Sequence, residues 1–137
     1  MLIDSNILIY AINIDSPKHK QAQQFLQESL GNLEIAHQNV LETIRVLTHQ
    51  KFSNPMKLKD ALIAIQAISK FCRVIYPTQT TYYLALEFIS KHKLVGNRIF
   101  DAYLAATALS NNIDIIATDN TSDFKKFNGI KIINPCR

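Results

Sequence analysis

The chain has 137 residues, of which 47% are hydrophobic and 19% are charged. This balance is typical of one globular domain and excludes a disordered or fibrous protein. The net charge of +4 is compatible with a nucleic-acid ligand without requiring one. Two cysteines without CxxC spacing and four scattered histidines exclude a disulfide-dense secreted fold and a Cys/His metal cluster.

The first residues show no basic region followed by a long apolar stretch, which a secretory signal peptide would have. No uncharged apolar stretch approaches the ~20 residues that a membrane span requires. We therefore expect a cytoplasmic protein that makes no membrane contact.

Glycine (3 residues) and proline (4 residues) are scarce, which favours long regular elements with short connections. In chain order, short apolar runs predict strands over residues 2–4, 33–36, 73–76, 113–117 and 130–133. Apolar residues at helical spacing predict a helical turn over 7–10 and helices over 17–30, 38–50, 58–71, 79–92, 99–111 and 123–127. Because helices and strands alternate, we expect one α/β domain over residues 1–137, a three-layer α/β/α sandwich with a mainly parallel sheet.

Acidic residues follow two of the predicted strands. Asp4 ends the first strand, and the segment 118–123, which contains Asp119 and Asp123, follows the fourth. In open parallel sheets, ligands bind beyond the carboxyl ends of the strands, so both positions are candidates for a functional site. The alternative is structural, because Asp4 can cap the following helix and the later acids can be ordinary turn residues.

Two more acids lie on predicted helices. Glu42 borders the apolar stripe of its helix, and the alternative to a functional role is a surface acid paired with Arg45. Asp101 is the only charged residue of the helix predicted over 99–111, which should be buried on most sides. A buried acid is costly unless it is paired or metal-bound, and the structural alternative is a pair with Arg98.

Together these positions place carboxylates from distant parts of the chain at one edge of one sheet. Such carboxylates repel one another, and no His or Cys lies among them. A hard divalent cation with oxygen ligands, Mg²⁺ or Mn²⁺, would neutralise them. Because this kind of ion engages phosphate oxygens, hydrolysis of a phosphodiester is the leading hypothesis.

These motifs also resemble those of a known family, the PIN-domain ribonucleases, and in particular the small VapC-type toxins of VapBC toxin–antitoxin modules. The resemblance implies a Mg²⁺- or Mn²⁺-dependent endoribonuclease that acts on RNA, forms a homodimer and is inhibited by a small antitoxin protein. It also implies that Asp4, Glu42 and Asp101 are the three core acids. The motifs that carry it are Asp4-Ser5-Asn6, Asn39-Val40-Leu41-Glu42, Asp101-Ala102-Tyr103-Leu104-Ala105-Ala106-Thr107-Ala108, and Ala117-Thr118-Asp119-Asn120 with Asp123-Phe124.

The fourth acidic position stays open. By the same resemblance, Asn120 stands where the family usually carries an acid or Asn, while Asp119 is adjacent and Asp123 lies one turn later. We take Asp119 as the fourth catalytic residue, and Asp119 or Asp123 as the group that completes the metal shell or holds a second ion.

The expected mechanism assigns a role to each remaining candidate. Asp4 and Asp101 bind the ion, and Glu42 orients or deprotonates the attacking water. Arg45 and Arg98 each lie one helical turn from a proposed site acid, close enough to meet a phosphate. Further substrate contacts are expected from Asn6, Thr118 and Asn120.

Three other functions remain as alternatives: a PIN-type DNA nuclease, a non-catalytic RNA- or protein-binding PIN scaffold, and a phosphatase of the haloacid-dehalogenase type. The phosphatase would use Asp4 as its nucleophile, but Asn6 stands where that chemistry needs a second acid. Some apolar residues exceed the needs of one small core and suggest a homodimer surface, with core packing as the alternative: Leu58, Leu62, Ile65, Leu84, Leu86 and Phe88.

Overall fold

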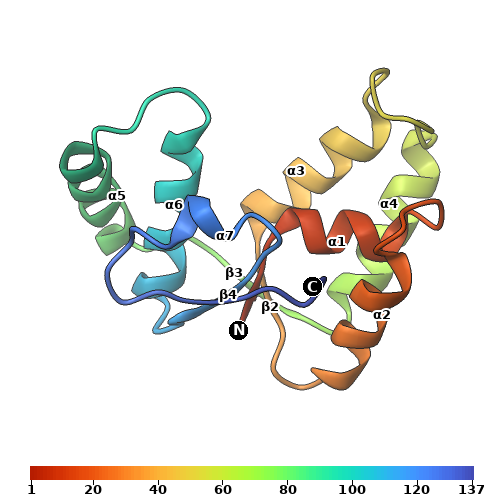
Figure 1. The fold of residues 1–137 in the computed structure, drawn as a ribbon, viewed down its shortest axis with the longest axis horizontal. Helices are drawn as coiled ribbons and strands as arrows, with labels where there is room; N and C mark the ends of the chain where they lie inside the picture. Colours follow the sequence, from red (N-terminus) through yellow and green to blue (C-terminus); the bar gives the residue numbers. More distant parts are fainter.

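The computed structural model describes all residues from Met1 to Arg137. Its strands are β1 (Leu2–Ile3), β2 (Glu34–Ala36), β3 (Arg73–Ile75), β4 (Ile115–Ala117) and β5 (Lys131–Ile133). Its helices are α1 (Ser5–Ile12), α2 (His19–Glu28), α3 (His37–Thr48), α4 (Leu58–Ser69), α5 (Gln79–His92), α6 (Arg98–Ser110) and α7 (Thr121–Phe124). The sheet lies between two groups of helices (Figure 1), which confirms the predicted three-layer α/β/α class.

The five strands form one sheet in the order β3-β2-β1-β4-β5, and every neighbouring pair is parallel. β1 occupies the centre, where Leu2 lies beside Glu34 of β2 and Ile116 of β4. The backbone N–H of Asp4 donates to the carbonyl of Ala117 at 3.0 Å. The residues that follow β1 and β4 are therefore neighbours at the carboxyl edge of the sheet, although they are far apart in sequence.

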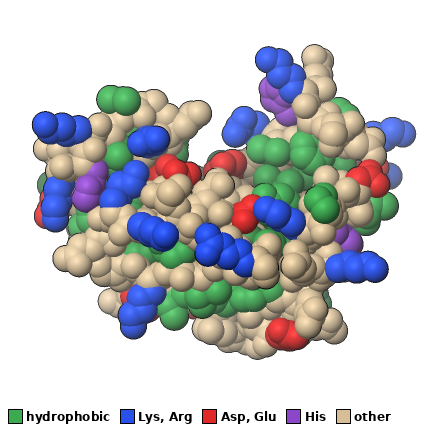
Figure 2. Space-filling model, viewed as in Figure 1, with side chains coloured by type: hydrophobic (Ala, Val, Ile, Leu, Met, Phe, Trp, Pro, Cys, Tyr) green, Lys and Arg blue, Asp and Glu red, His purple; other side chains and the backbone are tan.

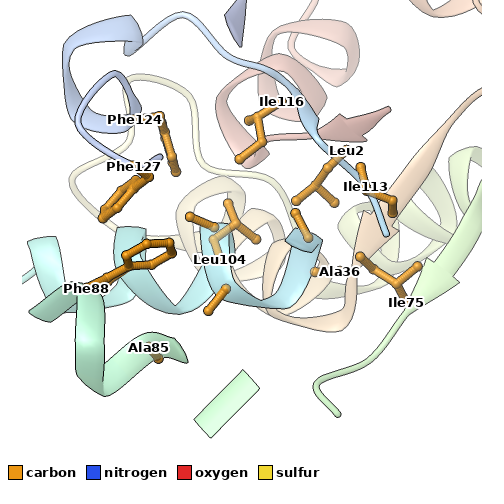
Figure 3. Packing of buried hydrophobic residues seen from close by; sticks show 14 of the residues in the cluster. Leu2, Ala36, Ile75, Ala85, Phe88, Leu104, Ile113, Ile116, Phe124 and Phe127 are labelled. Atoms are coloured by element: carbon orange, nitrogen blue, oxygen red, sulfur yellow. The ribbon is translucent and has the colours of Figure 1, made fainter. Parts of the chain in front are cut away.

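Alternating strand residues divide the core into two layers. Leu2 and Ile116 point to one face, where they pack with α5, α6 and α7 (Figure 3). Ile3 and Ala117 point to the opposite face, which is covered by α1, α2, α3 and α4. Each core therefore combines short strand segments with helices from one half of the chain, and the carboxyl edge of the sheet opens between these two halves.

Several helix boundaries differ from prediction by one to three residues, and two of these differences have a visible cause. α2 begins at His19 and not at residue 17, because the Ser16 hydroxyl accepts a hydrogen bond from the Lys18 backbone at 3.1 Å and closes a turn before the helix. α7 ends at Phe124, whereas the two phenylalanines had suggested a helix to residue 127. The Phe127 backbone bonds to the Phe124 carbonyl at 3.1 Å, so Phe127 reaches the core from a turn.

The apolar residues expected at a dimer surface fall into three groups. Leu84 is half-buried and packs against the core. Ile65 and Phe88 are only 1% and 6% exposed, so for them the expectation was wrong and core packing is the explanation. Leu58, Leu62 and Leu86 are exposed. None of the helices combines the length and apolar character that a bilayer span requires.

Candidate active site

A cleft of about 670 Å³ opens at the carboxyl edge of the sheet. Its walls carry Asp4 from the end of β1, Glu42 from α3, Asp101 from α6 and Asn120 from the segment between β4 and α7. Figure 2 shows acidic side chains on both sides of a hollow between the two groups of helices. The structure thus brings together the three acids that the sequence singled out as the core of the site.

Asp4 is both a helix cap and a wall of the cleft. One carboxylate oxygen accepts the backbone N–H of Ser5 at 2.8 Å, and the other accepts the hydroxyl of Thr118 at 2.7 Å and the amide of Asn6 at 3.4 Å. Burial raises the pKa of Asp4 to about 6, with a smaller contribution from the charge of Glu42, while the Thr118 and Ser5 hydrogen bonds oppose the rise. Asp4 therefore caps α1 and also lines the cleft, so the structural and the functional interpretation of this residue hold together.

Asp101 projects from the first turn of α6. The following turns are rich in alanine, and Ala102, Ala105 and Ala106 are fully buried, so the helix lies close against its neighbours as its lack of charge predicted. The pKa of Asp101 is also raised to about 6, first by burial and then by the carboxylates of Asp123, Asp4 and Glu42, and Lys126 only partly offsets them. No hydrogen bond to its carboxylate opposes this rise, in contrast to Asp4.

Two predicted substrate-binding residues other than Asn120 also line the cleft, Asn6 and Arg45. Arg45 is exposed and forms no ion pair with an acid of the chain, so the predicted alternative of a pair with Glu42 is not what the structure shows. Its guanidinium is free to meet a phosphate at the mouth of the cleft.

Two other predicted substrate contacts lie elsewhere. Arg98 is exposed but does not line the cleft, and it forms no ion pair with Asp101. Thr118 is fully buried, and its hydroxyl is used on Asp4. It therefore orients a carboxylate and does not face a substrate.

The acids after β4 do not join the cluster as expected. Asp119 does not line the cleft, because its carboxylate is bonded to Lys18, Tyr10 and Asn134 on another side of the loop. Its pKa is lowered, chiefly by the Lys18 hydrogen bond. Asp123 does not line the cleft either, although its charge raises the pKa of Asp101. Asn120 is the residue of this segment that faces the cleft.

Sequence reasoning missed several lining residues. His37 stacks on Tyr76 with ring centroids 5.5 Å apart, and Gln38 donates its side-chain amide to the carbonyl of Phe100 at 3.3 Å. These residues carry no signal of function by type or spacing, since their place depends on how α3 and α6 meet. The lining residues that were not predicted as site residues include Ser5, Ile9, His37, Gln38, Leu41, Asn97, Phe100, Leu104 and Phe124.

The donor chemistry of the cleft fits a hard divalent cation. Carboxylate and amide oxygens are suitable ligands for such a cation. A bound cation would also offset the electrostatic repulsion between the carboxylates. No three His, Cys, Asp or Glu side chains are gathered closely enough to enclose an ion by themselves.

Known proteins resemble the chain along most of its length. It is 28% identical to "Ribonuclease VapC24" of Mycobacterium tuberculosis over 97% of this chain and 94% of the relative. It is 26% identical to "Ribonuclease VapC37" of the same species, covering 98% of this chain and 96% of the relative.

Solved structures share the fold. DNA-bound VapBC from Salmonella typhimurium matches with a TM-score of 0.74 and 19% identity over 98% of this chain and 97% of that chain. A toxin-antitoxin complex from Klebsiella pneumoniae matches with a TM-score of 0.71 and 22% identity over 98% of this chain and 96% of that chain. The PIN domain family model matches residues 1–130. Because this match spans nearly the whole sequence, the chain belongs to the PIN domain family.

Proposed function

We propose that this protein is an endoribonuclease that hydrolyses RNA phosphodiester bonds and acts as the toxin of a toxin–antitoxin pair. The observation that carries this proposal is the convergence of Asp4, Glu42 and Asp101, from three separate elements, in one open cleft. The names of the aligned relatives, which are called ribonucleases, support the same activity.

We propose Mg²⁺ or Mn²⁺ as the cofactor, held by Asp4 and Asp101, with Glu42 and Asn120 beside them. When bound, such an ion supplies positive charge that acidifies a water and offsets the negative charge developing at phosphorus. Thr118 and Ser5 fix the orientation of the Asp4 carboxylate through the hydrogen bonds described above. The orientation of the Asp4 carboxylate is therefore set before substrate arrives.

The other cleft residues act on water and RNA. Glu42 orients the attacking water and accepts its proton, a task that suits a carboxylate lining the cleft from α3 while Asp101 lines it from α6. Arg45 binds a phosphate of the RNA chain and holds the scissile group against the carboxylates. Asp123 strengthens the negative field at Asp101, which favours occupation by a cation.

The test is incubation of the protein with labelled tRNA, mRNA and single-stranded DNA, each with Mg²⁺, Mn²⁺ or EDTA. We expect internal cleavage of RNA with either cation and none with EDTA. Cleavage of DNA alone would favour the DNA-nuclease alternative. Tight RNA binding without cleavage under any condition would favour the scaffold alternative.

Replacing Arg45 with alanine is expected to weaken RNA binding measured in EDTA, where no cleavage occurs. Because one phosphate contact is lost, the slope of log affinity against log salt should become shallower by about one. Arg98→Ala is the matched comparison, since its side chain lies outside the cleft, and it should have the smaller effect. An Arg45→Ala protein with unchanged affinity and salt slope would contradict the role of Arg45.

We also propose an antitoxin protein and a second copy of this chain as partners in the cytoplasm. Structural neighbours titled as toxin-antitoxin or VapBC complexes support the antitoxin. The exposed Leu58, Leu62 and Leu86 provide apolar surface for a homodimer. Light scattering at micromolar concentration measures the homodimer directly, and a monomer would contradict it.

A further inference from the structure

Asp119 anchors a network that joins four segments of the chain. Its carboxylate receives the Lys18 ammonium and, at 2.9 Å, the Tyr10 hydroxyl on one oxygen, and the Asn134 amide at 3.2 Å on the other. Lys18 lies in the turn before α2, Tyr10 lies on α1, and Asn134 follows β5. The Lys18 ammonium also lies 5.2 Å from the centre of the Tyr10 ring. The carboxylate is thus held from outside the cleft by one cation and two neutral donors.

The residues on either side of Asp119 are tied to the cleft, because Asn120 lines it and Thr118 bonds to Asp4, which also lines it. The Thr118 hydroxyl donates to Asp4 at 2.7 Å and accepts from the Asn6 amide at 3.1 Å and the Asn120 backbone at 3.0 Å. The Asp119 backbone N–H itself donates to the side-chain amide oxygen (Oδ1) of Asn6 at 3.3 Å. Anchoring Asp119 therefore fixes the hydroxyl that orients Asp4 and the turn that places Asn120 at the cleft wall.

Lys18 supplies the only charge that balances Asp119 in this network. Its side chain is 36% exposed, and an ion pair with such an exposed partner contributes little to the stability of the fold. Without Lys18, Tyr10 and Asn134 would still donate, but neither would offset the carboxylate charge. The pair is therefore better suited to fixing the position of a loop than to stabilising the whole protein.

We propose that Lys18 is a positioning residue for the metal site: by pairing with Asp119 it holds the loop 118–120 in the arrangement that orients Asp4 and places Asn120. This inference rests on the proposed function and gives Asp119 an indirect role in place of direct metal ligation. Groups that orient metal ligands are typically worth about 10- to 100-fold in metal affinity or activity.

The test compares Lys18→Met, Lys18→Arg and the wild-type protein by calorimetric titration with Mn²⁺ and by the kcat and KM of RNA cleavage. Lys18→Met is expected to weaken Mn²⁺ binding about 10-fold and to lower kcat more than it raises KM. Lys18→Arg keeps the positive charge and should restore most of both. Urea denaturation should show a small loss of stability in Lys18→Met, as expected for an exposed pair.

Arg73→Met is the matched control. It removes another ion pair of the sheet, Arg73 with Glu34 at 3.3 Å, which lies at the amino end of the strands, away from the cleft. Its Mn²⁺ affinity should equal that of the wild type. A loss of affinity in Arg73→Met equal to that in Lys18→Met would overturn the proposal, because the effect would then be a general one of stability.

The sign of the Lys18→Met effect separates the two possible roles of Asp119. If Asp119 were itself a ligand that Lys18 holds back, removing Lys18 would tighten Mn²⁺ binding, and tighter or unchanged binding overturns the proposal. If the wild-type protein cleaves RNA and Lys18→Met has the same Mn²⁺ affinity and kinetics, the positioning role is rejected and the proposed ribonuclease function still stands. If the wild-type protein cleaves no RNA but Lys18→Met still binds Mn²⁺ more weakly than the wild type does, the positioning role is supported and the ribonuclease function is rejected.

Discussion

An Asp101→Asn protein is expected to lose at least about 100-fold of the metal-dependent RNA cleavage, and yet to be more stable than the wild type when no divalent cation is present. The first effect follows because asparagine keeps the shape of the side chain but removes the charge that attracts a cation. The second follows because the wild-type carboxylate is half-buried beside other carboxylates, with no hydrogen bond to compensate. A residue that serves the site at the expense of the fold should show both effects at once.

The stability gain depends on pH in a defined direction. Because the folded-state pKa of Asp101 lies near 6 and its usual value is 3.8, the folded protein binds more protons than the unfolded chain between these pH values. The contribution of Asp101 to stability is therefore greatest below pH 3.8 and is lost as pH rises through 6. A shift of this size corresponds to about 3 kcal/mol for a fully buried group, and for a half-exposed one we expect about 1 kcal/mol at pH 7.5.

Urea denaturation in EDTA at pH 7.5 and pH 4.5 measures this difference, and melting with and without Mg²⁺ measures metal binding. Asp101→Asn should be more stable than the wild type at pH 7.5, should lose most of that advantage at pH 4.5, and should show no Mg²⁺-dependent rise in Tm. The control is Asp114→Asn, an exposed acid before β4, which should change neither property. An Asp101→Asn protein that is less stable than the wild type at both pH values would identify Asp101 as an ordinary structural acid.

The sequence was most informative where local patterns reflect burial. The apolar run at Leu2 and Ile3 predicted a buried strand, and the structure sends these side chains into opposite cores. The lack of other charges around Asp101 predicted a buried helix with one exceptional acid, and the alanines of α6 are indeed covered. In both cases consecutive residues without charge carried the signal, so it did not depend on the path of any loop.

The sequence was least informative for loop residues whose side chains can point either into the cleft or away from it. Asp119 and Asn120 are adjacent polar residues. Asp119 faces away from the cleft because its carboxylate bonds to Asn134 and to Lys18 and Tyr10, and the last two lie more than a hundred residues earlier. Arg98 precedes Asp101 by almost one helical turn, but it is Arg45 from α3 that reaches the cleft. Such choices depend on contacts between distant segments, which spacing within one segment does not encode.

Mn²⁺ binding is expected to weaken about 100-fold between pH 7 and pH 5, a range in which ordinary aspartates stay ionised. The pKa values of Asp4 and Asp101 are both raised to about 6 by burial and by neighbouring carboxylates. Each carboxylate is then about 90% ionised at pH 7 and about 10% at pH 5, so a cation that needs both must displace up to two protons at the lower pH. With pKa values of 3.8 the same change of pH would alter the affinity less than twofold.

Calorimetric titration with Mn²⁺ at half-unit steps of pH measures the effect, and RNA cleavage at subsaturating Mn²⁺ should fall with the same midpoint near pH 6. Thr118→Val tests the origin of the midpoint, because the Thr118 hydrogen bond is the largest influence that lowers the pKa of Asp4. Without this bond, Asp4 holds its proton to higher pH, so the midpoint for Mn²⁺ binding should move upward. Affinity that stays constant from pH 7 to pH 5 would show that Asp4 and Asp101 are not both ligands. A downward shift in Thr118→Val would show that the threonine hydroxyl does not stabilise the charged form of Asp4, and the orientation of the site would then need another source.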